Sequence, residues 1–280
     1  MERPTHIICD IDGVLRREGD VMPGVPELFC AMYQKKVVAS LLSNNSRVRG
    51  KDVATEMDTL YQVNPDHIPH AITSADATAA WIKENPSNDP ERGVYLVGGP
   101  GIRMKLVELG ILLRTNAWNG KQWNGDFPSD VICGFSKEID YPTLSGGWNA
   151  IRQGGARFIA TNPDPEYRAE GGLLLPANGA AVGYLRTAGT EPIVIGKPDI
   201  IMAEMALRDT HAKKESSHIA ILGDTVDQDV ALANNLRKAG WNTEAWVVLT
   251  GVLDQATAES TPNIHRIFQD ITDVRRQMFT

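Results

Sequence analysis

The chain alternates short apolar runs, rich in β-branched residues, with longer amphipathic stretches, and most of the apolar runs end in Gly, Asn, Ser or Asp. This alternation is typical of repeated β-α-β units, whose strands form a parallel sheet. Because the runs are apolar throughout, we expect helices to cover both faces of the sheet. The predicted strands are His6–Cys9, Val37–Leu42, Val94–Val97, Val131–Gly134, Arg157–Thr161, Pro192–Ile195, His218–Leu222 and Ala245–Leu249.

The stretches between these runs repeat apolar residues at helical spacing and predict helices. Thr73 and Asp76 form the pattern of a capping box, in which two residues exchange hydrogen bonds at the start of a helix. The polar segments 85–92 and 116–128 contain Asn, Gly and Pro and are expected to be surface loops. The predicted helices are Val25–Gln34, Asp76–Glu84, Ile102–Leu109, Tyr141–Arg152, Asp199–Asp209 and Asp229–Ala239.

Length and charge restrict the classes of protein to which the chain can belong. A chain of 280 residues is too long for one small core and suggests two domains. Hydrophobic residues make up 42% and charged residues 22%, which is typical of a folded globular protein. With 28 basic and 35 acidic residues the net charge is −7, which disfavours nucleic-acid polymers and membrane surfaces as partners.

Signals for export and membrane insertion are not seen in the sequence. The first twelve residues carry charges and no long apolar run, so we expect no secretory signal. The longest uncharged stretch, 171–184, is broken by Gly, Pro and Asn and is too short to span a membrane. Cys9, Cys30 and Cys133 form no CxxC or Cys/His pattern, which argues against a disulfide framework and a structural zinc site. We therefore expect a cytoplasmic protein.

Polar residues directly follow several of the apolar runs. In an open parallel sheet, ligands bind beyond the carboxyl ends of the strands, so these residues are the first candidates for a site. Asp10 and Asp12 follow the first run, and Gly13 permits a sharp turn after them. Two carboxylates this close require a cation or a shared proton. Taken alone, the pattern also fits a turn with a helix-capping Asp.

Three further runs end in the same way. Ser43, followed by two Asn residues, also fits an ordinary helix N-cap. Lys197, held between Gly and Pro, also fits a solvated lysine. Asp224 and Asp229 suit a hard cation such as Mg²⁺, although an acidic helix start has the same appearance. The four motifs together, each at the end of an apolar run, favour one shared site.

Read in order, the four motifs resemble those of the haloacid dehalogenase (HAD) superfamily, and more narrowly of its NagD-like class IIA phosphatases. Three further segments look like the recurring cap segments of that subfamily, and the resemblance covers nearly the whole chain. The motifs are DIDGV at 10–14, SNN at 43–45, GKP at 196–198 and GDTVDQD at 223–229, and the cap segments are TSADATA at 73–79, ATNPD at 160–164 and PANGA at 176–180.

The resemblance implies an α/β fold in which a Rossmann-like HAD core with a parallel sheet carries an inserted α/β cap domain of class II, subtype A. Spacing independently supports an insertion, because Ser43 and Lys197 lie 154 residues apart, whereas a β-α-β crossover needs only roughly a few tens. We predict a discontinuous core of residues 1–74 and 189–280 and a cap of residues 75–188. A cap that roofs the site would exclude water and restrict substrates to small molecules.

Phosphoryl transfer requires a nucleophile, neutralisation of negative charge and a proton for the leaving oxygen. Asp10 is the predicted nucleophile, which would form an aspartyl-phosphate. Asp12 is predicted to protonate the leaving alkoxide and then to deprotonate the attacking water. Lys197 is predicted to neutralise the phosphoryl charge and to hold Asp10 in place.

The family pattern also implies a Mg²⁺ site. Its predicted ligands are the carboxylates of Asp10 and Asp224 and the backbone carbonyl of Asp12. Asp229 is either a further ligand through water or a support for Lys197 and Asp224.

A second set of residues is predicted to bind the phosphate group of the substrate. Ser43 is predicted to hydrogen-bond a phosphoryl oxygen, assisted by the backbone N–H groups of Asn44 and Asn45. Arg47, just after this loop, would bind an anionic or polyhydroxy substrate, and a surface Arg on a helix is the alternative.

The cap offers candidates for recognition of the leaving group. Asn162 and Asp164 would bind substrate hydroxyls, or else form a structural turn. Trp118 and Trp123 would stack on a nucleobase, or else pack under their own loop. Relatives often carry an acid where this chain has Ser136, so their substrates do not transfer directly.

These residues predict a magnesium-dependent phosphatase of small phosphomonoesters, such as a nucleoside monophosphate, a sugar phosphate or a glycerol phosphate. Two alternatives are a phosphotransferase or mutase, and a catalytically idle HAD-fold binding module. The expected partner is a small phosphorylated metabolite, with neither nucleic-acid polymer nor membrane, and the resemblance suggests a homodimer through the cap.

Overall fold

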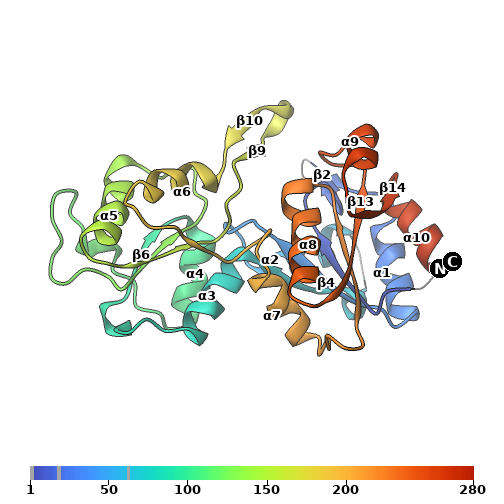
Figure 1. Ribbon diagram of the computed structural model, residues 1–280, viewed down its shortest axis with the longest axis horizontal. Coiled ribbons are helices and arrows are strands. Elements are labelled where there is room, and N and C mark those ends of the chain that lie inside the picture. Colours follow the sequence, from blue (N-terminus) through green and yellow to red (C-terminus); the bar gives the residue numbers. More distant parts are fainter. Residues whose placement is uncertain (1–2, 18–19, 62–63) are drawn as a thin grey trace. The chain divides into compact units, whose positions relative to one another are not determined.

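The strand that ends in Asp10, β1 (His6–Asp10), lies in the middle of a six-stranded sheet (Figure 1). The structure, a computed structural model, describes residues 3–17, 20–61 and 64–280. From one edge to the other, the sheet contains β14 (Ile264–Phe268), β13 (Asn242–Val248), β12 (His218–Gly223), β1, β4 (Val38–Ser43) and β5 (His70–Thr73).

The register of β1 explains why the polar motifs meet. β1 pairs in parallel with β12 on one side and with β4 on the other, where Asp10 lies opposite Leu42. Because parallel strands share a direction, their carboxyl ends lie at one edge of the sheet. The parallel pairing therefore places Asp10, Ser43 and Asp224 at the same edge of the sheet. The chain also changes direction along the sheet at β1, and open α/β sheets bind their ligands at such a point.

Helix α1 (Val25–Gln34) has the bounds predicted from the sequence, and it buries Val25, Leu28, Phe29 and Met32 at helical spacing. Burial of each such side chain contributes about 1.5–3 kcal/mol. Helix α10 (Ile271–Phe279) packs against α1. The other helices around this sheet are α2 (Gly50–Tyr61), α7 (Ile201–Asp209), α8 (Ala231–Lys238) and α9 (Gln255–Ser260), and a short hairpin of β2 (Arg16–Arg17) and β3 (Asp20–Val21) follows the first motif.

A second parallel sheet, of four strands, forms in the middle of the chain. In order across the sheet, its strands are β11 (Ile193–Val194), β8 (Arg157–Ala160), β7 (Asp130–Cys133) and β6 (Val94–Val97), and every pair is parallel. The other elements of this region are α3 (Ser74–Glu84), α4 (Pro100–Glu108), α5 (Tyr141–Arg152), α6 (Asn178–Arg186) and a hairpin of β9 (Glu166–Arg168) and β10 (Leu174–Pro176). Alternate residues such as Tyr95, Val97 and Val131 form one apolar cluster with helices α5 and α6.

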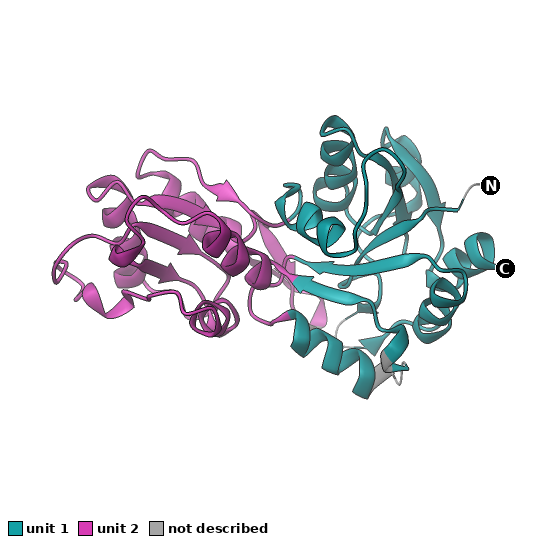
Figure 2. Ribbon diagram, turned by 90° about the horizontal axis from the view of Figure 1, so that it is seen from below, with its two compact units in different colours: residues 1–43, 50–72, 197–280 teal, residues 44–49, 73–196 magenta. Residues whose placement is uncertain are grey.

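The two sheets belong to two compact units (Figure 2). Unit 1 comprises residues 1–43, 50–72 and 197–280, and unit 2 comprises residues 44–49 and 73–196. The inserted segment is therefore longer than the predicted 75–188, since β11 pairs with β8 of unit 2. Residues 44–49, which we predicted in the core, also belong to unit 2. There the fully buried Ser46 accepts hydrogen bonds from the backbone N–H groups of Ile102 and Phe135.

Strand β14 and helix α2 are among the elements that the sequence analysis did not predict. Strand β14 reads Ile-His-Arg-Ile-Phe and lies at an edge of its sheet, so polar residues interrupt the apolar run. Helix α2 was not predicted, although Val53 and Met57, which lie four residues apart, are both buried. The capping box of Thr73 and Asp76 at the start of α3 is confirmed.

The sequence analysis predicted neither a membrane-spanning helix nor a disulfide framework. Among the described helices, none has the length and apolar character required to cross a membrane. Cys9, Cys30 and Cys133 are free thiols.

The capping box gives a test of this fold. Asp76 accepts hydrogen bonds from the backbone N–H and the hydroxyl of Thr73, and it pairs with Lys105 on α4. Asp76→Ala should lower the free energy of unfolding by about 1–2 kcal/mol, which corresponds to about 2–8 °C in thermal unfolding. Asp89→Ala removes an exposed acid without a capping bond and should leave the unfolding temperature within about 1 °C. Equal unfolding temperatures for the two variants would contradict the role of Asp76.

Candidate active site

A buried lysine joins two carboxylates at the carboxyl edge of the unit 1 sheet. The Nζ atom of Lys197 lies 2.7 Å from Oδ1 of Asp10 and 2.7 Å from Oδ1 of Asp229. Only 2% of Lys197 is exposed, so the alternative of a solvated lysine is wrong. Charge-assisted hydrogen bonds of this length, shielded from water, fix the positions of all three side chains.

The backbone after Lys197 is itself anchored. Asn235 on α8 donates a hydrogen bond of 3.0 Å from its side-chain amide to the carbonyl of Pro198. This bond ties the segment that carries the lysine to a helix of unit 1. The Gly-Lys-Pro motif therefore supplies its ammonium from a fixed segment of backbone.

Asp229 is positioned by a rare element, the single π-helical turn Val226–Val230 that precedes α8. Such turns recur at functional sites. Oδ2 of Asp229 accepts hydrogen bonds from the backbone N–H groups of Asp224 and Thr225 and from the hydroxyl of Thr225. Both carboxylate oxygens are thus bound within the protein. Of the two sequence-based hypotheses for Asp229, the contacts favour support of Lys197 and Asp224.

Asp224 lies in a cradle of two glycines. Its Oδ2 accepts a hydrogen bond of 2.9 Å from the backbone N–H of Val252. A Cβ atom at Gly13 or Gly251 would overlap the Asp224 carboxylate, and Gly13 has a φ of +82°. The glycine of the DIDGV motif therefore serves both the turn and the close approach of Asp224.

Asp10, Asp224 and Asp229 form a cluster that fits a divalent cation. One carboxylate oxygen from each lies within 4.8 Å of the others, and all three residues are buried. Three carboxylates with the ammonium of Lys197 have a net charge of −2 when ionised, which one divalent cation would balance. Carboxylate oxygens are ligands that Mg²⁺ prefers. Because both oxygens of Asp229 are occupied, Asp10 and Asp224 are the better candidates for direct ligands.

The pKa values in this cluster show the same excess of negative charge. Burial raises the pKa of Asp224 to about 7, and the nearby charge of Asp229 acts in the same direction. Burial also raises the pKa of Asp10; Lys197 opposes this rise, while Asp229 and Asp224 add to it. Burial disfavours the ammonium form of Lys197, but the attraction of Asp10 and Asp229 outweighs burial and raises its pKa.

Asp12 differs from its buried neighbours, since 59% of its side chain is exposed. Oδ1 of Asp12 accepts a hydrogen bond of 2.8 Å from Nε of Arg16. Arg16 in turn donates to both oxygens of Glu56 on α2, at 2.7 and 2.6 Å. The sequence analysis did not identify Arg16 or Glu56. Arg16 lies four residues after Asp12, which is a usable signal, whereas Glu56 has no local relation to the motif.

Ser43 ends β4 and is 2% exposed, at the same edge of the sheet as Asp10. Its neighbours in the SNN motif, Asn44 and Asn45, belong to unit 2. The structure thus brings together Ser43, Asp10 and Lys197 within unit 1, and places the two amides in the segment that begins unit 2.

Three predicted residues of unit 2, Asn44, Asn162 and Asp164, form a hydrogen-bonded network with Asn178. The side-chain amide of Asn44 donates to Asp164 at 2.9 Å. The amide of Asn162 donates to the carbonyl of Asn44 at 2.7 Å, and Asn178 donates to the carbonyl of Asn162 at 2.7 Å. Asn162 is 1% exposed. These contacts favour the structural turn among the two hypotheses for Asn162 and Asp164.

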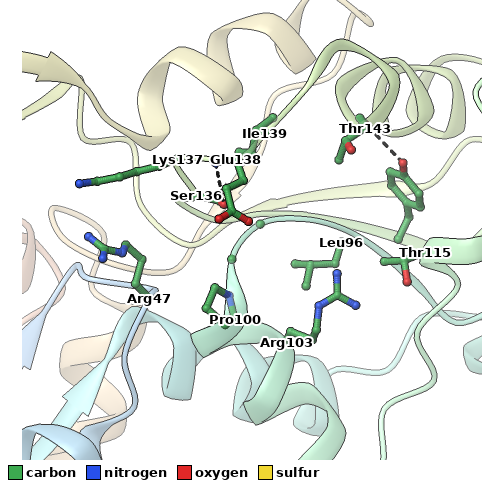
Figure 3. Close-up of a pocket in the computed structure, with 13 residues that line it drawn as sticks. Arg47, Leu96, Pro100, Arg103, Thr115, Ser136, Lys137, Glu138, Ile139 and Thr143 are labelled. Carbon is green, nitrogen blue, oxygen red and sulfur yellow. Dashed lines mark hydrogen bonds between the residues drawn. The ribbon is translucent and has the colours of Figure 1, made fainter.

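Other unit 2 candidates lie elsewhere. The indole of Trp118 donates to the carbonyl of Pro142, the indole of Trp123 donates to Asn149, and both rings pack against the apolar core of unit 2. This packing favours a structural role of the two Trp residues over nucleobase stacking. Arg47 is exposed and lies at the wall of a cavity that Ser136 also lines (Figure 3).

Comparisons with known proteins agree with these motifs. A model of the haloacid dehalogenase-like hydrolase family matches residues 7–112, and a second HAD-like hydrolase model matches residues 194–274. A dihydroxyacetone phosphatase of Corynebacterium glutamicum is 33% identical over 91% of this chain and 84% of that relative. An acid sugar phosphatase of Staphylococcus saprophyticus is 27% identical over 97% of this chain and 96% of that relative. The solved structure of NagD from E. coli K-12 matches with a TM-score of 0.78 at 26% identity, over 97% of this chain and 98% of that chain.

The excess negative charge of the acidic cluster predicts that Mg²⁺ stabilises the folded protein. Saturating Mg²⁺, at about one hundred times its Kd, should add about 2.7 kcal/mol to the free energy of unfolding. Asp224→Asn should be at least as stable as the parent in EDTA, because it removes a buried charge, and should gain little from Mg²⁺. Thermal unfolding with and without Mg²⁺ measures both effects.

Asp227→Asn is the matched control, since Asp227 is an exposed acid in the same turn. This variant should retain the full Mg²⁺ shift of the parent. A Mg²⁺ shift in Asp224→Asn as large as that of the parent would exclude Asp224 as a ligand.

Proposed function

Because the chain belongs to the haloacid dehalogenase superfamily and, within it, to the NagD-like class IIA phosphatases, we propose that it hydrolyses small phosphomonoesters in a Mg²⁺-dependent reaction through an aspartyl-phosphate on Asp10. The observation that carries this proposal is the buried ammonium of Lys197, 2.7 Å from the carboxylates of both Asp10 and Asp229. A lysine in this position orients one carboxylate and presents positive charge beside it.

The first step is an in-line attack of Asp10 on phosphorus. Lys197 binds Oδ1 of Asp10, so we assign the attack to Oδ2. The O–P bond to Asp10 forms as the bond from phosphorus to the leaving oxygen breaks. Lys197 offsets the negative charge on the phosphoryl oxygens, because its ammonium stays protonated between two carboxylates.

Asp12 is the proposed general acid and general base. It would donate a proton to the leaving alkoxide, and then accept one from the water that attacks the aspartyl-phosphate. Its exposure suits both exchanges, because the carboxylate has access to solvent. The ion pair with Arg16, which Glu56 anchors, holds the Asp12 carboxylate in one orientation.

The phosphoryl group would be held by Ser43 together with the backbone N–H groups of Asn44 and Asn45. Asp10 and Asp224 would hold Mg²⁺, with the backbone carbonyl of Asp12. When bound, Mg²⁺ supplies positive charge that neutralises the phosphoryl group.

The substrate class we infer is a small sugar or triose phosphate. The names of the two relatives, a dihydroxyacetone phosphatase and an acid sugar phosphatase, support it. Glycerol phosphate belongs to the same size class. A nucleoside monophosphate is less favoured, since Trp118 and Trp123 are engaged in packing.

We also infer a cytoplasmic enzyme, which the three free cysteines support, because reducing compartments preserve thiols. A homodimer through unit 2 is part of the same proposal. Val107 and Leu112 are exposed apolar side chains of unit 2 that a second copy would cover.

Phosphate release from a panel of triose, sugar, glycerol and nucleoside phosphates, with and without Mg²⁺, tests the function. Asp10→Asn should lower kcat at least about a thousandfold, because it removes the nucleophile. Acid-quenched parent enzyme should carry a phosphoryl group on the Asp10 peptide by mass spectrometry. Asp227→Asn, again the control, should keep parental activity.

Two other results would replace this proposal. Transfer of the phosphoryl group to a second hydroxyl compound, with no free phosphate, would indicate a phosphotransferase or mutase. A folded protein that binds Mg²⁺ but releases phosphate from no compound would indicate an idle binding module.

The ion pair of Asp12 predicts an effect that depends on the leaving group. Arg16→Ala should lower kcat about tenfold for glycerol phosphate, whose alkoxide needs a proton, and much less for p-nitrophenyl phosphate, whose leaving group does not. Glu56→Gln should give a smaller loss with the same selectivity. Arg17→Ala, which removes an exposed neighbour bound to a backbone carbonyl, is the control. Equal losses with both substrates would contradict a role of Arg16 in proton donation from Asp12 to the leaving group.

A further inference from the structure

The segment after β13, residues 250–252, contacts the acidic cluster, although none of the four sequence motifs includes it. In the unit 1 sheet β13 pairs in parallel with β12, and Gly223 at the end of β12 lies opposite Val247. Both strands therefore end at the same edge of the sheet, where Asp224 follows β12. The segment reads Thr-Gly-Val and begins just beyond the end of β13.

Gly251 and Val252 hold the carboxylate of Asp224. The backbone N–H of Val252 donates a hydrogen bond of 2.9 Å to Oδ2 of Asp224, whereas Val252 itself is 70% exposed. A Cβ atom at Gly251 would overlap the same carboxylate. Gly251 does not have a positive φ, so close approach, and not an unusual backbone conformation, requires glycine here. The segment therefore binds Asp224 through its backbone.

Thr250 holds the turn of the first motif. Its hydroxyl donates a hydrogen bond of 2.7 Å to the carbonyl of Gly13. The N–H of Gly13 donates to the carbonyl of Arg16 at 2.8 Å. These two bonds fix the Gly13 backbone on both sides. They therefore also fix the adjoining carbonyl of Asp12, which is the proposed metal ligand from this turn.

One segment of three residues thus connects two proposed ligands of the metal. Thr250 binds the turn that carries the Asp12 carbonyl, and Val252 binds Asp224. A Cβ atom at Gly13 would also overlap the Asp224 carboxylate, so the turn and the carboxylate are in close contact. Because residues 250–252 are covalently linked, the hydrogen bond of Thr250 limits how far the carbonyl and the carboxylate can separate.

The separation of two ligands affects which cation a site prefers. Mg²⁺ requires a near-octahedral arrangement of ligands at about 2.0–2.1 Å, whereas Ca²⁺ accepts a more flexible arrangement at about 2.3–2.6 Å. A site whose ligands are held close together therefore favours Mg²⁺. A site whose ligands can move apart loses part of that preference.

We propose that Thr250 is a positioning residue of the metal site: its hydroxyl holds the Asp12 carbonyl close to the Asp224 carboxylate and so favours Mg²⁺ over the larger Ca²⁺. Thr250 acts through the Gly13 backbone and is not itself a ligand. This inference rests on the proposed function, because it concerns the cation that the proposed reaction uses.

Calorimetric titration of the metal-free full chain with Mg²⁺ alone and with Ca²⁺ alone tests this role without hydrolysis. Thr250→Val keeps the branched shape of the side chain but removes the hydroxyl. It should raise the Kd for Mg²⁺ about tenfold, as loss of a bond that orients a metal ligand typically does. The Kd for Ca²⁺ should rise by no more than about threefold, because Ca²⁺ tolerates less regular geometry.

Two further variants of Thr250 separate the hydroxyl from the rest of the side chain. Thr250→Ser keeps the donor and should bind both cations with parental affinity. Thr250→Ala removes the donor with a smaller side chain and should give the same losses as Thr250→Val. The test therefore does not depend on the folding of one variant.

Thr261→Val is the matched control. The hydroxyl of Thr261, at the end of α9, also donates a hydrogen bond of 2.7 Å to a backbone carbonyl, that of Thr257. This variant should lose a similar amount of stability, because it loses the same kind of bond, and should keep parental affinity for both cations. Circular dichroism and thermal unfolding in EDTA measure the fold and the stability of each variant.

Four results would overturn the proposal. These are a parental Kd for Mg²⁺ in Thr250→Val, equal losses of Mg²⁺ and Ca²⁺ affinity in that variant, no recovery in Thr250→Ser, or a loss in Thr261→Val as large as in Thr250→Val. A purely structural role of Thr250 would lower the unfolding temperature without changing the relative affinities for the two cations.

The titrations also separate this inference from the proposed hydrolysis. A parent chain that shows the expected Mg²⁺ binding and the expected loss in Thr250→Val, but releases no phosphate, would remove the proposed function and leave the role of Thr250. An active, Mg²⁺-dependent parent whose Thr250→Val variant has the parental Kd would do the opposite. A parent that binds neither cation would remove both.

Discussion

The bonds from Lys197 to Asp10 and Asp229 are the interaction on which the rest of the site depends. An ammonium buried without partners would lose its proton or destabilise the fold, and three buried carboxylates without a cation would repel one another. Together they leave a site that needs one more divalent positive charge. The proposed metal follows from that balance.

The sheet of unit 1 makes this balance possible. Parallel pairing of β1 with β12 and β4 brings three strand ends to one edge, although their residues are far apart in the chain. Lys197 directly follows a segment of more than a hundred residues, and that segment folds around its own sheet. An insertion of this size between two core elements leaves the register of the core sheet intact, because its ends join at the sheet edge.

Unit 2 uses its polar residues in two ways. Asn44, Asn162, Asn178 and Asp164 satisfy one another and buried backbone groups, which is the expected state of amides in a dry interior. The cations of Arg47 and Lys137 instead lie over aromatic rings beside a cavity. Polar residues of unit 2 thus bind one another in one place and lie over aromatic rings in another.

The sequence by itself determined the α/β class, most of the strands, the inserted module, and the residues at the strand ends. It did so because apolar runs, helical spacing and turn residues are local properties, and because the four motifs stand in order. Tertiary structure decided how these residues act. Asp229 became a support because a π-helical turn directs both its oxygens to Lys197 and to the 224–225 backbone. Glu56 joined Asp12 through Arg16 because α2 packs beside the first motif, a proximity across 40 residues that no spacing rule reveals. Contacts between distant segments depend on how helices and strands pack together, and local patterns in the sequence do not specify that packing.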